Sequence, residues 1–329
     1  MVLLLFVGPV LLPEYRDRNA GRIDLLSVSQ SLVAVLGIIY GLKQLAEHGF
    51  GWPPAVALAV GLAVGAGFAL RQVELSYPLL DLHLFRRPRF GAAIAAYGLS
   101  CLAMFGVYIF VTQYLQLVLG LGPLPAGLAT MPWAFAFIAS SLMTARLGRR
   151  WGPASVLIWW LAIAATGFAL LALSEGRFAI FILVGGIVIL SLGLAPVFTI
   201  CNDMVMSAAP PERAGAASAL AETALEFMGA LGIAVLGSIG AIIYRRVLAT
   251  TMPGRLPDVA ANDALATLGA AAAIAIDLNT PADAALLAAA RSAFSESFHA
   301  VAVIALVIAV SSSFLSARLP RDRSRQPSR

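Results

Sequence analysis

The chain has 329 residues, of which 60% are hydrophobic and only 12% are charged, and its mean hydropathy is +0.89. Soluble domains are about half apolar and about a quarter charged, so this composition excludes a water-soluble fold and requires a lipid bilayer around the protein. The net charge of +5 would permit a nucleic-acid partner, but the positions of the basic residues, given below, favour anionic lipid headgroups and no nucleic acid.

Apolar stretches long enough to cross a bilayer recur from residue 24 to residue 317. Backbone polar groups in lipid must pair within their own segment, so we predict helices and not the short alternating strands of a barrel. Proline and glycine mark the turns, as at Pro53-Pro54 and Gly152-Pro153. The predicted fold class is all-α, a polytopic membrane helical bundle. Its eight complete spans cover residues 24–46, 53–70, 90–119, 124–145, 153–173, 178–206, 214–244 and 298–317.

The chain opens with a short apolar stretch, residues 1–12, that leads into Pro13 and Glu14. Twelve helical residues rise about 18 Å, whereas the hydrocarbon core is about 30 Å thick. No basic region precedes the stretch, so no signal peptide is recognisable. We interpret residues 1–23 as the cytoplasmic end of a truncated span with its loop, and we predict that the chain is a fragment or a reading frame that starts late.

The segment 246–297, between the last two spans, is rich in alanine, and we predict that it is an outer loop. Within it, Thr280-Pro281 with Asp283 is typical of a helix start, and the helix is expected to run into the last span. The Arg- and Ser-rich tail, residues 320–329, is predicted to be disordered.

The basic residues predict the orientation of the spans. With residue 24 on the cytoplasmic side and alternate crossings after it, 16 of the 22 Lys and Arg residues are cytoplasmic. The positive-inside rule favours this orientation. We therefore expect a multi-pass protein of the plasma (cell inner) membrane, with both ends of the complete spans in the cytoplasm.

Acidic residues within the hydrocarbon region are rare and are functional candidates by default. Three are present: Asp203, Glu222 and Glu226. Glu222 and Glu226 are four residues apart, so they share one face of a helix about 6 Å apart along its axis. Two carboxylates in a low-dielectric site cannot both ionise at low cost, so we expect a coupled pair that can hold a proton or face a cation. The alternative is that each acid pairs with an arginine or a neighbouring helix.

Aromatic and amide side chains in the third and fourth spans could line a cavity for a flat, lipophilic cation, held by cation–π contacts and a carboxylate. The alternative is that they pack between helices or anchor them at the membrane interface. The candidates are Tyr97, Phe105, Tyr108, Gln113, Tyr114, Gln116 and Trp133.

No catalytic or metal-binding set is recognisable in the sequence, so we expect neither an enzyme nor a cofactor. His48, His83 and His299 lack metal-ligand spacing and are interpreted as interface residues. Cys101 and Cys201 are interpreted as small core residues.

Four stretches in a fixed order carry a family resemblance: Pro78 to Arg86, Gln113 to Gly120, Pro210 to Ala219 and Ala230 to Ser238. Together they resemble the fourteen-span drug:proton antiporters of the major facilitator superfamily (the EmrB/QacA type). The resemblance implies a major facilitator-type C-terminal half with two extra central spans, and with the N-terminal half missing. Residues 24–89 would hold the two central linker spans and an amphipathic cytoplasmic segment, and residues 90–319 the C-terminal six-helix bundle.

The resemblance also implies roles for particular residues. Family members carry acids at positions matching Glu222 and Glu226, which implies recognition of cationic drugs or coupling to protons. The expected function is proton-coupled efflux of hydrophobic or cationic drugs, with protons and lipophilic cations as partners. The stretch with Arg146, Arg149, Arg150 and Gly152 resembles the later copy of the superfamily's cytoplasmic loop motif, but Arg149 stands where that motif usually has Asp. This departure puts charge-relay gating at that loop in doubt.

Two alternatives to a complete transporter stay open. The chain can be a fragment or membrane subunit that transports nothing until it pairs with a missing N-terminal half or a second copy. A membrane enzyme is a more distant alternative, because no clustered His, Asp and Ser set is visible.

Overall fold

The computed structural model describes residues 24–48, 51–75, 78, 88–208, 214–252, 258–278 and 281–317. Residues 1–23, the loop with His83 and the tail after residue 317, for which predictions were made above, lie outside these ranges. Throughout the described part of the chain the regular structure is helical, which agrees with the predicted fold class.

Eight helices in the described residues are long and apolar enough to cross a membrane. They confirm the number of spans predicted from hydropathy, and most of their ends differ from the predicted ones by a few residues. They are α2 (Leu25–His48), α3 (Trp52–Glu74), α4 (Pro88–Gln113), α5 (Pro123–Trp151), α6 (Pro153–Ala172), α7 (Ala179–Ala208), α8 (Ala214–Thr251) and α11 (Pro281–Ala317).

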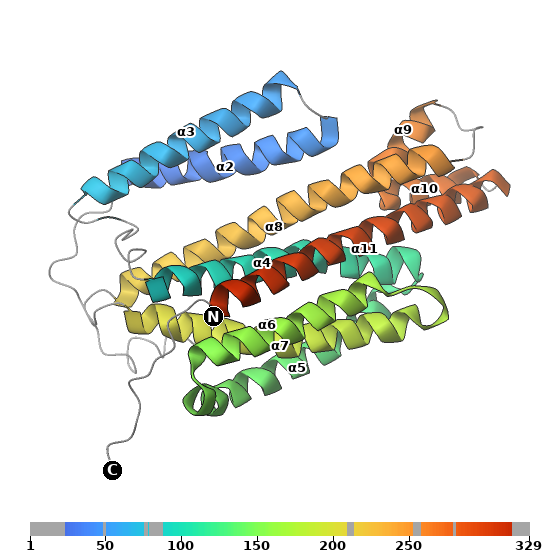
Figure 1. Ribbon diagram of the computed structural model, residues 1–329. Coiled ribbons are helices and arrows are strands. Elements are labelled where there is room, and N and C mark those ends of the chain that lie inside the picture. The colour runs from blue at the N-terminus through green and yellow to red at the C-terminus, as the bar shows by residue number, and fades with distance from the viewer. Residues whose placement is uncertain are drawn as a thin grey trace, which may run out of the picture.

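Six of these helices form one bundle, seen in Figure 1 as the group from α4 to α11. Helix α4 packs against α8, α11 and α7, while α6 packs against α7 and α11, and α5 packs mainly against α7. The α4–α8 contact is very close, because a Cβ atom at Gly232 would collide with the backbone carbonyl of Leu102. Small residues at such crossings let helix backbones approach each other within a membrane.

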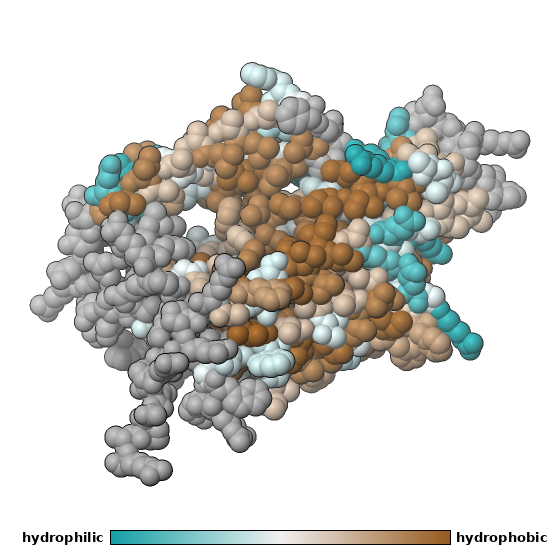
Figure 2. Space-filling view, in the orientation of Figure 1, coloured by the Kyte–Doolittle hydropathy of each residue, from teal (hydrophilic) through white to brown (hydrophobic). Residues whose placement is uncertain are grey.

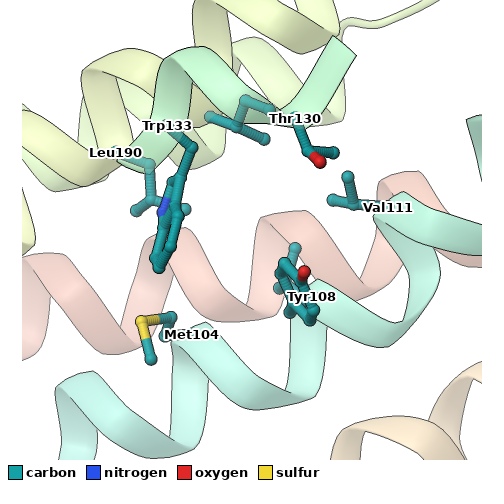
Figure 3. A pocket seen from close by; sticks show the side chains of 8 residues that line it. Met104, Tyr108, Val111, Thr130, Trp133 and Leu190 are labelled. Carbon is teal, nitrogen blue, oxygen red and sulfur yellow. The ribbon is translucent and has the colours of Figure 1, made fainter. Parts of the chain in front are cut away.

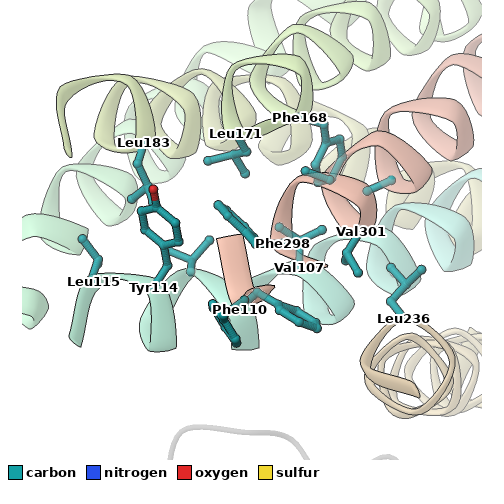
Figure 4. Close-up of a cluster of buried hydrophobic side chains, with 14 of the residues drawn as sticks. Val107, Phe110, Tyr114, Leu115, Phe168, Leu171, Leu183, Leu236, Phe298 and Val301 are labelled. Carbon is teal, nitrogen blue, oxygen red and sulfur yellow. The ribbon is translucent and has the colours of Figure 1, made fainter. Parts of the chain in front are cut away.

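The interior of the bundle is a cluster of buried apolar side chains shared by α4, α6, α7, α8 and α11 (Figure 4). Phe168 and Phe298 are fully buried there, and Tyr114 packs on Phe298 with ring centroids 5.2 Å apart. The outer surface is also apolar over much of its area, as the brown side chains in Figure 2 show. A surface of this kind is the one that lipid solvates.

A π-helical turn, η2 (Tyr114–Val118), continues α4. The Tyr114 hydroxyl donates a hydrogen bond to the carbonyl of Ser174 (2.7 Å), and Arg291 Nε of α11 donates one to the carbonyl of Leu117 (2.8 Å). Side chains thus satisfy the backbone carbonyls of Ser174 and Leu117. The two hydrogen bonds hold the end of α4 against α11 and against the α6–α7 connection.

Helices α2 and α3 form a separate hairpin that lies alongside α8 (Figure 1). At one end of the hairpin, Arg71 Nε donates a hydrogen bond to Asp24 Oδ2 (2.7 Å), and Ser27 donates another to the same carboxylate oxygen (2.7 Å). Gln72 completes this polar clasp through a 2.8 Å hydrogen bond to the Ser27 hydroxyl. The clasp therefore joins the start of α2 to the end of α3.

The segment 246–297, which we predict to be an outer loop between the last two spans, is largely helical where the structure describes it. Helix α8 runs on to Thr251, two short helices follow, α9 (Asp258–Ala266) and α10 (Leu268–Leu278), and α11 begins at Pro281. The Tyr244 hydroxyl of α8 donates a hydrogen bond to the Ala264 carbonyl of α9 (3.0 Å), which holds the segment against the bundle. The physical reason is the alanine content, which favours helix throughout. The predicted continuation of the helix after Pro281 into the last span is confirmed.

Candidate functional site

Five aromatic side chains from α4, α5 and α7 form a continuous arc, which we call the aromatic ladder: Tyr97, Tyr108, Trp133, Phe137 and Phe198. Successive ring centroids lie 6.4 Å apart for Tyr108–Trp133, 5.6 Å for Trp133–Phe137, 6.1 Å for Phe137–Phe198 and 5.3 Å for Phe198–Tyr97. Tyr97 and Tyr108 are eleven residues apart on α4, so the ladder extends about 16 Å along the axis of that helix. Tilted and edge-on contacts at these distances are the favoured aromatic geometries.

One end of the aromatic ladder borders a small pocket between α4, α5 and α7. The pocket has a volume of about 20 Å³, which is room for roughly one water molecule. Tyr108 and Met104 reach it from α4 and Trp133 from α5 (Figure 3). Its lining is almost entirely apolar, and in this structure it is too small to hold a ring.

A proline inside α7 explains how Phe198 is positioned against α5. Pro196 lies inside α7 and has no backbone N–H, so the carbonyl of Leu192, four residues earlier, loses its helical partner. The Ser140 hydroxyl of α5 donates a 2.8 Å hydrogen bond to that same carbonyl. Two further polar contacts, Ser191 to the Trp133 carbonyl (2.8 Å) and Ser141 with Thr199 (3.2 Å), join the same two helices. The register that brings Phe137 next to Phe198 is thereby fixed.

The acidic pair lies near the other end of the aromatic ladder. Glu222 is close enough to Tyr97 and Cys101 to interact with them electrostatically, and Glu226 interacts with Cys101 in the same way. Both carboxylates are exposed on α8, one helical turn apart. Within the described residues no basic side chain pairs with either of them. The acidic pair and the Tyr97 end of the ladder are therefore neighbours. We call the surface that they form together the open wall, because Glu222, Glu226 and Tyr108 are exposed on it and the other four rings are half-buried.

The third acid, Asp203, is also exposed, near the end of α7. Its neighbour Val205 packs with Ala217 and Ala221 of α8, so the end of α7 lies against the start of α8. The end of α7 that carries Asp203 therefore lies near the part of α8 that carries the acidic pair, but the structure records no contact between Asp203 and either glutamate.

The other candidate residues lie apart from the aromatic ladder. Phe105 packs over Gly229 of α8. Gln113 and Gln116 are half-buried at the π-helical turn, and Tyr114 is buried in the core, where it packs on Phe298. Phe137 and Phe198 were not among the sequence candidates. Their signals were the four-residue spacing from Trp133 to Phe137 and the position of Phe198 two residues after Pro196.

The loop motif is described only in part. The side chains of Arg146, Arg149 and Arg150 lie outside the described part of the structure, as does that of His48. Gly152 separates α5 from α6 with a φ of 78°, a left-handed conformation that favours glycine. His299 of α11 contacts Glu175 (3.1 Å) and the Ser174 carbonyl (3.3 Å). Among the described residues no His, Cys, Asp and Glu group could hold a metal ion.

The eight helices, long and apolar enough to cross a membrane, define the class of the protein as a polytopic membrane protein. Residues 16–233 match the family model described as Major Facilitator Superfamily. The match covers more than half of the chain, so the chain belongs to the Major Facilitator Superfamily, whose members are membrane transporters and not enzymes.

Several curated proteins are similar to the chain. The multidrug efflux pump LfrA of Mycolicibacterium smegmatis is 36% identical over 305 residues, which are 93% of this chain and 60% of LfrA. The puromycin resistance protein pur8 of Streptomyces alboniger is 31% identical over 247 residues, 73% of this chain and 48% of pur8. The multidrug resistance protein Stp of Mycobacterium tuberculosis is 29% identical over 267 residues, 81% of this chain and 50% of Stp. The chain thus spans half to three fifths of the length of these relatives.

Among solved structures, a bacterial homologue of the human lysosomal transporter Spinster aligns with 89% of this chain and 67% of its own, with a TM-score of 0.48 and 17% identity. The family membership rests on the sequence match and not on this alignment.

Proposed function

We propose that the chain is the C-terminal part of a proton-coupled efflux transporter of the fourteen-span type, which exports lipophilic cations. The observation that carries the proposal is the shared wall, on which the aromatic ladder leads to the exposed pair Glu222 and Glu226. Aromatic faces attract a cation by about 0.5–2 kcal/mol each, more when water is excluded. A carboxylate pair adds a charge that a proton can neutralise.

The chemistry of the wall gives a mechanism. With the acidic pair deprotonated, the wall binds a cation between carboxylates and aromatic rings. Protonation removes the negative charge and weakens cation binding, so proton and cation compete for one site. A transporter that rocks between two states couples the two movements if each state favours one ligand.

The exposure of the acidic pair supports a second wall opposite the first. A charged carboxylate facing lipid is costly, so such residues face the bundle interior or a water-filled cavity. In the proposed transporter the helices that cover Glu222 and Glu226 come from an N-terminal half. The hairpin α2–α3 would provide the two extra central spans, and α4 to α11 the C-terminal bundle.

The second candidate function is a subunit that transports nothing by itself. The observation that favours it is the open wall, where Glu222 and Glu226 are exposed and need other helices to cover them. In that case a separate N-terminal half, or a second copy of this chain, would complete the cavity.

The test is efflux of a fluorescent lipophilic cation from vesicles that contain only this chain and carry an imposed proton gradient. Efflux that stops when an uncoupler is added, and that is lost in the E222Q/E226Q double variant, supports transport by the chain itself. No efflux from correctly inserted chain means that further helices are needed to complete the cavity, which both candidates allow. Binding of the same cation to the purified chain then tests the site itself. Both candidate functions require the cation to bind at the open wall, so absence of binding contradicts both.

A further inference from the structure

A groove runs along the exposed face of the α2–α3 hairpin, away from the acidic pair and the aromatic ladder. Its volume is about 860 Å³, and it is a shallow groove that is open along the surface of the hairpin and not an enclosed pocket. The side chains that border it are Val33, Leu36 and Tyr40 on α2 and Trp52, Val56 and Val60 on α3.

Close packing of the two helices explains the groove. A Cβ atom at Gly37 would lie 3.1 Å from the Cα atom of Gly61, and one at Gly61 would lie 2.7 Å from the backbone nitrogen of Ile38. Because the helices meet at glycines, their backbones come close together at the crossing. The larger side chains on either side project beyond the crossing and border the groove. Val33, Leu36 and Trp52 remain 47%, 63% and 82% exposed.

The groove has a polar end at the α2–α3 connection. Lys43, the sole lysine of the chain, lines it there, close to Tyr40 and Trp52. The Tyr40 hydroxyl accepts a 2.8 Å hydrogen bond from Gln44 Nε2, which fixes its position. Tyr and Trp beside a basic residue at the end of a span are typical of the level of the lipid headgroups.

We propose that this groove binds an anionic phospholipid, with one acyl chain along the groove and the phosphate at Lys43. Val33 and Lys43 are ten residues apart, so the groove is about 15 Å long, which is the depth of one leaflet of a hydrocarbon core of about 30 Å. The Lys43 ammonium also interacts within the protein. It has three N–H donors, so it can bind a phosphate oxygen in addition.

The charge at the groove's end selects among possible occupants. The Lys43 ammonium has donors and no acceptor, so it can donate to a phosphate oxygen of an anionic headgroup but offers no binding group to a lipophilic cation, the substrate class proposed above. The lipid site and the substrate site therefore differ in the sign of the charge they bind. The inference does not depend on the proposed function, because it needs only that the hairpin spans the membrane.

The experiment uses the full chain in nanodiscs and the fluorescence of Trp52, which phospholipids with brominated acyl chains quench. The Trp52 signal is the difference between the chain and its Trp52→Phe variant. Brominated phosphatidylglycerol is compared with brominated phosphatidylcholine at equal mole fractions. Because one basic residue near the membrane surface attracts an anionic lipid, we expect about fivefold stronger association of the anionic lipid.

Matched variants test whether Lys43 causes this preference. Lys43→Gln should abolish the preference for the anionic lipid. Lys43→Arg keeps a cation at the groove and Arg246→Gln removes one elsewhere, so both variants should retain the preference. Equal quenching by the two lipids in the unmodified chain would overturn the proposal. A preference for the anionic lipid that survives Lys43→Gln would also overturn it. Quenching of Trp52 by a brominated lipophilic cation in place of the lipid would overturn it as well. So would protection of Trp52 from quenching that rises with protein concentration, because that result would place a second copy of the chain in the groove.

Discussion

At the scale of single residues, the acidic pair is the feature on which the proposed function depends most. We predict that Glu222→Gln and Glu226→Gln each weaken binding of a lipophilic cation to the purified chain by about ten- to hundredfold, since a hydrogen bond to a charged group contributes about 1.5–3 kcal/mol. The double variant should also lose the weakening of binding that acid causes in the unmodified chain. Fluorescence titration at several pH values measures both effects.

Asp203→Asn is the matched control for that prediction, because it removes an exposed carboxylate that has no recorded contact with the pair. Its cation affinity should stay within about twofold of the unmodified chain. A double variant whose affinity still depends on pH would show that other groups carry the proton.

Trp133 is the largest member of the aromatic ladder, and it borders the pocket shown in Figure 3. We predict that Trp133→Leu weakens binding of the cation by about three- to thirtyfold, because a cation–π contact of about 0.5–2 kcal/mol is lost while apolar bulk is kept. Trp159→Leu is the control, since Trp159 on α6 is 64% exposed and lies outside the ladder. Equal losses in the two variants would assign the effect to packing. A neutral analogue of the ligand should bind both variants alike.

At the scale of elements, the contact between α5 and α7 depends on a hydroxyl that serves a proline-interrupted helix. We predict that Ser140→Ala lowers the free energy of unfolding by about 1 kcal/mol, because the Leu192 carbonyl is left without a donor. Thermal unfolding in detergent measures this loss. Thr166→Ala is the control, because Thr166 is exposed and its hydroxyl bonds only within α6. An unchanged unfolding temperature for Ser140→Ala would mean that water or another group replaces the serine.

The polar clasp of the α2–α3 hairpin gives a prediction about pH. The hydrogen bond from Arg71 lowers the pKa of Asp24 from 3.8 to about 2. Since the folded hairpin favours the carboxylate, the clasp's contribution is present above about pH 4 and is lost as the pH falls through about 2. Spin labels at positions 26 and 73 should give a narrow distance distribution at pH 5 that broadens toward pH 2.

Asp24→Asn should give the broad distribution at every pH, and Glu74→Gln, which removes a nearby exposed carboxylate, should behave like the unmodified chain. A narrow distribution in Asp24→Asn would mean that the glycine crossing alone holds the hairpin together.

At the scale of the whole molecule, hydropathy predicts the spans because crossing a bilayer requires length and apolarity, and both are local properties of the sequence. The helices α9 and α10 were missed because they do not cross a membrane and because alanine gives little hydropathy contrast. The acids Glu222 and Glu226 could be named from their position in an apolar helix. Phe137 and Phe198 could not, because their contact depends on the register of α5 against α7, which Ser140 and Pro196 set in three dimensions.

The whole chain is also asymmetric in what it exposes. The lipid groove on the α2–α3 hairpin carries a basic residue, and the proposed cavity wall on α8 carries acidic ones. Because the two sites carry opposite charge and lie on separate helices, the bound lipid and the bound substrate can be varied independently. The effect of each ligand on the protein can then be measured separately.

The π-helical turn Tyr114–Val118 has a consequence for how the chain tolerates insertions and deletions. A π turn holds one residue more than an α turn, so deletion of a single residue there can be absorbed by conversion to α-helix. A deletion between Phe90 and Val111 has no such reserve, and it would rotate one part of α4 by about 100° relative to the other. Tyr97 and Tyr108 could then no longer both face their neighbours, Phe198 and Trp133. Length variation among relatives of this chain is therefore expected to concentrate at the π turn, while the helix before it keeps a constant length.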